Sequence, residues 1–175
     1  WGLADVEDAQ YAIGHLASLG KIDSERCIIR GGSAGGYTVL SALTFTDTFK
    51  AGASLYGIGN LETLATDTHK FESRYLDSLI GPYPERKDIY IKRSPINHIE
   101  GLNCPVIFLQ GLQDKVVPPN QAEMMVALLQ SKGIKVAYVT FDDEGHGFRK
   151  ANNIIRAMES ELAFYQEVFN LVETI

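Results

Sequence analysis

Ser33 lies in a glycine-rich stretch, Gly31-Gly32-Ser33-Ala34-Gly35, that fits the Gly-x-Ser-x-Gly pattern of a serine nucleophile. A short apolar run precedes this stretch, and apolar residues at helical spacing follow it. The order predicts a strand, a sharp turn that carries the serine, and a helix. We expect a strained backbone at the serine, and we expect glycine to be required at residues 31 and 35 because a side chain there would collide with the strand or the helix.

Two further residues complete a set suited to nucleophilic catalysis. Asp114 and His146 each follow a predicted strand, as Ser33 does. The carboxyl ends of parallel strands share one edge of a sheet, so we expect the three side chains to lie together there. A serine hydroxyl is a poor nucleophile until an imidazole takes its proton, and a carboxylate fixes the tautomer of that imidazole. The chain order serine, aspartate, histidine is the order found in α/β-hydrolases.

Other roles for these residues remain open at this point. Asp114 could cap its own loop, and His146, which lies between two glycines, could be a turn residue. Three acidic residues share the loop of His146 and are expected to face solvent, namely Asp142, Asp143 and Glu144. The other histidines are expected to be structural: His15, His69 and His98.

Helical and strand patterns alternate along the whole chain, which predicts an α/β fold with helices on both faces of a mostly parallel sheet. The expected helices lie near residues 5–20, 37–45, 119–133 and 154–172, with a partly helical segment at 61–80 that has Phe71 on its apolar face. The expected strands lie at 26–30, 51–56, 105–110 and 136–141, and residues 82–94 are expected to be irregular. The last helix is expected to bury one stripe, made of Ile155, Met158, Leu162, Tyr165 and Phe169.

Composition excludes several classes of protein. The chain has 175 residues, a formal net charge of −6 and no cluster of lysine or arginine, so it lacks the basic surface of a nucleic-acid-binding protein. No apolar stretch approaches the length of a membrane span, and no signal peptide is evident. The two cysteines show no metal-binding or redox spacing, which favours free thiols and a cytoplasmic location. No cofactor or metal site is expected.

The position of Ser33 near the start of the chain suggests an incomplete domain. The first residue is Trp1, and only 32 residues precede the serine. In an α/β-hydrolase, several strands and a loop of the oxyanion hole come before the nucleophile. We therefore expect residues 1–175 to be the C-terminal part of a three-layer α/β-hydrolase catalytic domain whose sheet is incomplete on its N-terminal side.

Motifs along nearly the whole chain resemble the catalytic domain of the prolyl oligopeptidase family of serine peptidases, in particular its acylaminoacyl-peptidase and dipeptidyl-peptidase branch. The resemblance rests on the serine stretch together with Trp1-Gly2, Ser94-Pro95, the run from Gly111 to Pro118 and the run from Glu144 to Phe148. Family members commonly have His where this chain has Gln110, a position outside the three residues discussed above.

The resemblance implies a role for each candidate residue. Ser33 is expected to be the nucleophile, Asp114 the acid that orients the imidazole, and His146 the general base. The backbone N–H of Ala34 is expected to be one donor of the oxyanion hole. The resemblance also places Tyr37 and Tyr56 in the substrate pocket, with a role as core aromatics as the alternative.

The same resemblance implies partners outside this sequence. These are an N-terminal β-propeller of the same polypeptide, which admits only short peptides, and an upstream loop that supplies the second oxyanion donor. We expect low activity from residues 1–175 alone, and pairing of copies through the exposed sheet edge. The predicted function is hydrolysis of short peptides of N-acylaminoacyl, dipeptidyl or prolyl type through an acyl-enzyme. A carboxylesterase and a non-catalytic binding domain of the same fold are the alternatives.

Overall fold

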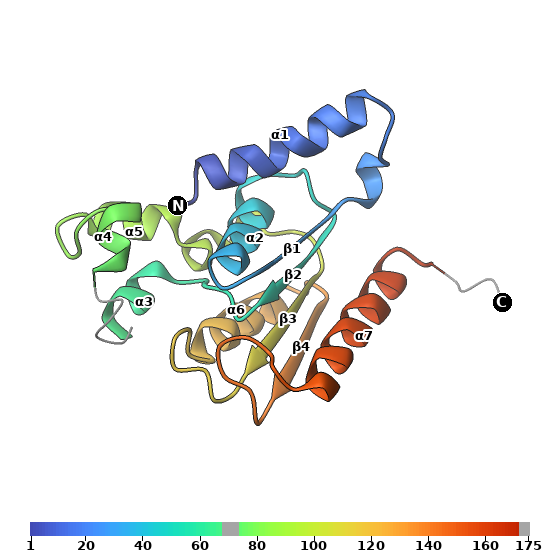
Figure 1. Cartoon of the computed structure of the whole chain (residues 1–175). Coiled ribbons are helices and arrows are strands. Elements are labelled where there is room, and N and C mark those ends of the chain that lie inside the picture. The colour runs from blue at the N-terminus through green and yellow to red at the C-terminus, as the bar shows by residue number, and fades with distance from the viewer. Residues whose placement is uncertain (68–73, 172–175) are drawn as a thin grey trace.

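The computed structural model describes residues 1–67 and 74–171 (Figure 1). Its centre is a four-stranded parallel sheet, as the alternating pattern predicted. The strands follow one another in the order β1-β2-β3-β4. The strands are β1 (Ile28–Gly32), β2 (Ala51–Leu55), β3 (Val106–Gly111) and β4 (Val136–Phe141). The expectations for His69 and Phe71 fall outside the described residues. The last helix ends at Val168, earlier than the predicted Val172.

Helices cover both faces of this sheet, so the predicted three-layer α/β arrangement is confirmed. On one face, α1 (Ala4–Ser18), α2 (Ala34–Phe45) and α6 (Asn120–Ser131) pack over a core that includes Leu40, Phe108 and Met125. On the other face, α7 (Ala151–Val168) packs over Leu55, Leu109 and Phe141 (Figure 1). The two central strands, β2 and β3, are buried along their whole length because helices cover both faces of the sheet there, and their residues are mostly apolar.

Register brings the carboxyl ends of all four strands to one edge. Gly32 pairs with Leu55, Leu55 with Leu109, and Gly111 with Phe141. The loops after β1, β3 and β4, which carry the three candidate residues, therefore leave the sheet side by side.

The segment between β2 and β3 is more helical than expected. It contains α3 (Leu61–Asp67), α4 (Tyr75–Leu79), α5 (Lys87–Arg93) and a 3₁₀ segment at Pro95–Gly101. The expectation that residues 82–94 are irregular was therefore wrong for residues 87–93, whereas residues 82–86 form turns. Tertiary contacts favour the helix there, because Tyr90 is fully buried with its hydroxyl donating to the Gly81 carbonyl at 2.8 Å, and Lys87 forms an ion pair with Glu62 at 3.2 Å.

The last helix leaves most of its predicted stripe exposed, although Tyr165 packs against the core on the sheet side. Ile155, Met158 and Leu162 are exposed by 53%, 62% and 58%, whereas Ala157 and Phe164 face the sheet. This helix has two apolar stripes, and helical spacing alone does not say which one meets the sheet. The exposed stripe borders a hollow of about 550 Å³ beside the open edge of β1.

An ion pair between half-exposed Arg30 on β1 and buried Glu161 on α7 ties this helix to the sheet. Glu161 lies on the sheet-facing side and is 7% exposed, and both of its carboxylate oxygens accept from Arg30 Nε at 2.9–3.0 Å. The Tyr165 hydroxyl also donates to Glu161, at 3.1 Å.

None of the described helices combines the length and the apolar character needed to cross a membrane.

Candidate active site

Ser33 lies at a sharp turn between the last residue of β1 and the first residue of α2. Its backbone has φ 55° and ψ −119°, a conformation that costs a residue with a side chain about 1–3 kcal/mol. A hydrogen bond from its N–H to the Leu55 carbonyl at 2.9 Å ties the turn to β2. The strained serine expected from the sequence is therefore present.

Close approach of backbones explains two glycines at this turn. A Cβ on Gly31 would lie 2.5 Å from the Gly35 carbonyl oxygen, and a Cβ on Gly36 would lie 2.6 Å from the Gly57 Cα. The expectation for Gly35 was wrong, because its Cβ would meet no described atom within 4 Å apart from its chain neighbours and the backbone of its own helix. The restriction at this end of α2 comes from the loop after β2, which packs against residue 36.

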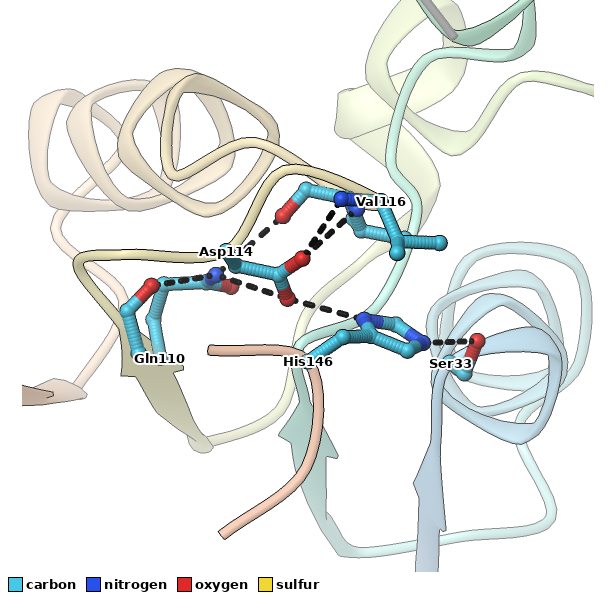
Figure 2. A network of polar contacts seen from close by, with 7 residues as sticks. Ser33, Gln110, Asp114, Val116 and His146 are labelled. Atoms are coloured by element: carbon cyan, nitrogen blue, oxygen red, sulfur yellow. Dashed lines mark hydrogen bonds and ion pairs between the residues drawn. The ribbon is translucent and has the colours of Figure 1, made fainter. Parts of the chain in front are cut away.

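Asp114 lies in the loop after β3 and is 4% exposed. Its Oδ1 accepts the backbone N–H groups of Val116 and Val117, each at 2.9 Å. Its Oδ2 accepts from the Gln110 side-chain amide at 3.4 Å and lies 2.8 Å from Nδ1 of His146 (Figure 2). Asp114 thus caps its own loop with one oxygen and contacts the histidine with the other.

His146 joins the three loops. Its Nε2 lies 2.8 Å from the Ser33 hydroxyl oxygen, and its Nδ1 faces Asp114 (Figure 2). A carboxylate only accepts hydrogen bonds, so Nδ1 carries the ring proton and Nε2 accepts from the serine hydroxyl. The structure therefore brings all three predicted side chains together, with the imidazole between the serine and the aspartate.

The acidic residues of the His146 loop differ in exposure. Asp142 and Asp143 face solvent as expected. Glu144 does not, because it is 3% exposed and its carboxylate accepts the backbone N–H groups of Arg149 and Lys150 at 3.1 and 2.9 Å. The sequence gives no signal for this burial, since the donors are backbone groups that only the folded loop brings to the carboxylate.

The other described histidines lie elsewhere. His15 is exposed on α1, and His98 packs against Phe45 with ring centroids 5.3 Å apart. The described residues contain no group of three histidine, cysteine, aspartate or glutamate side chains that could hold a metal ion. Cys27 and Cys104 are free thiols, and burial raises the pKa of the Cys104 thiol to about 11.

A cavity of about 240 Å³ opens beside Ser33 and His146. Ala34 also borders it, and because Ala34 is the first residue of α2, no helical carbonyl precedes it to accept its N–H. The remaining lining side chains are apolar or aromatic: Trp1, Ile58, Leu64, Tyr75, Val116 and Val117. In the sequence, such residues resemble ordinary core positions, so their place in a cavity had no sequence signal.

Neither tyrosine expected in the substrate pocket is among the residues that line this cavity. Tyr37 is fully buried behind it, stacks on Trp1 with centroids 5.3 Å apart, and donates to the Arg93 carbonyl at 2.9 Å. Burial raises the pKa of Tyr37 to about 12. Tyr56 lies at the end of β2 with its ring 5.0 Å from the His146 ring, where it borders the hollow under α7.

Comparisons with known proteins indicate one family. The family model described as the prolyl oligopeptidase family matches residues 1–172. Among curated proteins, dipeptidyl aminopeptidase BIII of Pseudoxanthomonas mexicana is 32% identical over 153 residues, which cover 84% of this chain and 22% of that protein.

Solved structures match over nearly the whole chain. A puromycin-hydrolysing peptidase of Mycobacterium tuberculosis has a TM-score of 0.94 at 50% identity, covering 96% of this chain and 26% of its own. The acylaminoacyl peptidase of Pyrococcus horikoshii has a TM-score of 0.88 at 28% identity, covering 94% of this chain and 28% of its own. This chain therefore spans about a quarter of the length of these relatives.

Proposed function

Because this chain belongs to the prolyl oligopeptidase family, we propose that it carries the nucleophile, base and acid of a serine peptidase that hydrolyses short peptides through an acyl-enzyme. The observation that carries the proposal is the position of His146, with Nε2 2.8 Å from the Ser33 hydroxyl and Nδ1 2.8 Å from the Asp114 carboxylate. The names of its relatives, among them a dipeptidyl aminopeptidase and an acylaminoacyl peptidase, support short peptides as substrates.

The proposed reaction has two acyl-transfer steps. The Ser33 oxygen attacks the scissile carbonyl while His146 Nε2 takes the hydroxyl proton. The backbone N–H of Ala34 donates to the resulting oxyanion at the positive end of α2. The tetrahedral intermediate collapses, His146 gives its proton to the departing amine, and an ester to Ser33 remains. Water, activated in turn by His146, then hydrolyses that ester and restores the serine.

The cavity beside Ser33 supports substrates with an apolar side chain on the acyl side of the cleaved bond. Its walls at Ile58, Leu64 and Val117 offer no ion-pair partner to a charged side chain. A buried, unpaired charge costs several kcal/mol. An apolar residue at this position is therefore the substrate class that the cavity favours.

A series of short peptide nitroanilides tests this function on the protein in its full natural length. We expect kcat/KM for Phe or Leu before the nitroanilide to exceed that for Lys or Glu by about 10²-fold or more, given the cost of burying a charge. The Ser33→Ala variant, assayed in parallel, measures the background. Cleavage of simple esters without cleavage of any peptide amide would contradict the proposal and favour a carboxylesterase.

We also propose that residues 1–175 are the C-terminal part of a larger catalytic domain. Two observations support this. Among the described residues, no strand pairs with the outer edge of β1, and the exposed stripe of α7 beside it is apolar at Ile155, Met158 and Leu162. An additional part of the polypeptide, or a second copy of the chain, would cover both features. A loop outside these residues would supply the second oxyanion donor.

Activity of residues 1–175 alone is expected to be low. Loss of one oxyanion donor typically lowers kcat by about 10²–10³-fold. We expect that deficit when the chain, shown by circular dichroism to be folded, is compared with the full-length protein on the same nitroanilide. Equal kcat for the two would mean that these residues already contain the complete oxyanion site.

A further inference from the structure

We propose that Glu144 is a positioning residue that closes the loop carrying His146 and so holds Nε2 against Ser33. This inference rests on the function proposed above, because it concerns how the base of that reaction is kept in place. Glu144 does not touch the serine or the imidazole in the described contacts; it acts through the backbone that carries His146.

The carboxylate of Glu144 connects the two ends of the loop. Its Oε2 accepts the N–H of Arg149 at 3.1 Å, and its Oε1 accepts the N–H of Lys150 at 2.9 Å and the side-chain amide of Asn153 at 2.9 Å. These donors lie five to nine residues further along the chain, just before α7 and in its first turn. The side chain thus turns residues 144–150 into a closed ring with His146 on its rim.

The backbone of Glu144 connects the same loop to the loop of Asp114. Its carbonyl accepts the N–H of Gln113 at 2.9 Å, and the Gln113 side chain donates to the Asp142 carbonyl at 2.9 Å. A Cβ on Gly111 would lie 2.5 Å from the Glu144 carbonyl oxygen, so the two loops are in close backbone contact. Glu144 therefore joins the loop that carries Asp114 to the loop that carries His146.

Glycines on both sides of His146 make this closure necessary. Gly145 and Gly147 have wide backbone freedom, and Gly147 has φ +87°, so neither residue fixes the direction of the histidine by itself. The segment that contains both glycines is held at residue 144 by the hydrogen bond from Gln113. It is held at residues 149 and 150 by the Glu144 carboxylate. Without the carboxylate, the far end would keep only the packing of Phe148 on Phe141 and the exposed contacts that Asp143 makes with Lys150 and Asn153.

The charge of Glu144 suits its donors. Lys150 directs its ammonium to Asp143, so the partners of Glu144 are uncharged N–H groups at the amino end of α7, where a helix favours negative charge. The hydrogen bonds from Asn153 and from the two backbone groups hold the pKa of Glu144 below its ordinary value. A neutral amide at this position keeps the shape but turns an NH₂ group toward a donor.

Glu144→Gln in the full-length protein tests the proposal. We expect kcat to fall by about 10²-fold, the cost of a displacement near 1 Å at a reacting group. KM for the peptide nitroanilide should stay unchanged, since the apolar walls of the cavity are untouched, and the rate at which a fluorophosphonate labels Ser33 should fall by the same factor. Asp142→Asn, an exposed carboxylate of the same loop, is the matched control and should react as the unmodified protein does.

Two measurements separate this role from folding and from the proposed function. Kinetic constants are expressed per titrated active site, and Asn153→Ala, which removes one of three donors, should give a smaller fall in the same direction if Glu144→Gln unfolds. Proton NMR of the Nδ1–H of His146 requires no activity, and its downfield signal should broaden or vanish in Glu144→Gln. A folded variant with a sharp signal and unchanged labelling would overturn the proposal, whereas an unreactive parent protein with this NMR response would overturn only the proposed function.

Discussion

Ser33→Ala and His146→Ala are each expected to lower kcat on a peptide nitroanilide by about 10⁶-fold, because the two groups act as one unit in moving a single proton. The double variant should be no slower than either single variant, since removing one partner already makes the other useless. Steady-state assays of the three variants of the full-length protein measure both expectations.

Matched substitutions control for effects on folding. Ser131→Ala and His15→Ala alter the same residue types at exposed helical positions far from the site, and kcat should stay within about twofold, as is usual for surface changes. A double variant slower by the product of the two single effects would mean that Ser33 and His146 contribute independently. That result would contradict the proton transfer assigned to the 2.8 Å contact between them.

Asp114→Asn is expected to lower kcat by about 10⁴-fold with little change in KM. The reason lies in the two oxygens of Asp114. Oδ1 accepts the N–H groups of Val116 and Val117, so an asparagine will leave its one oxygen there and turn its NH₂ toward His146. Nδ1 must then accept, the ring proton moves to Nε2, and the imidazole can no longer take the proton of Ser33.

Asp142→Asn is again the matched control, because Asp142 is exposed and lies one loop away. Thermal unfolding should show that Asp114→Asn remains folded, since its shape and its loop-capping oxygen are kept. A decrease of less than about tenfold, far below the effect that a wrong tautomer produces, would show that Asp114 does not set the tautomer of His146.

The sequence predicted the family and the sheet well because both depend on short-range patterns. The family resemblance, based on motifs from Trp1 to Phe148, is confirmed by the match over residues 1–172. The strand 136–141 was predicted with its observed bounds, since a six-residue run rich in β-branched and aromatic residues between turn residues favours a strand over a helix. The meeting of Ser33, Asp114 and His146 followed from the rule that parallel strands end at one edge.

Other features depend on contacts that no local pattern records. The orientation of α7 is decided by which of two apolar stripes meets the sheet, and Glu161, a charged residue, lies on the chosen side through its bond to Arg30. The burial of Glu144 depends on backbone donors that gather only when the loop closes. The crowding at Gly36 rather than Gly35 depends on the path of the loop after β2, which brings Gly57 alongside.

At residue 33, the proposed reaction and the stability of the backbone favour different residues. Glycine adopts φ 55° without strain, but glycine has no hydroxyl. The proposed reaction therefore requires a serine at a position where glycine would be more stable. The strain energy at Ser33 is present in every folded molecule, so contacts elsewhere in the sheet have to offset it. If the proposed reaction were no longer required, replacing Ser33 with glycine would therefore stabilise the fold, although the hydroxyl would be lost.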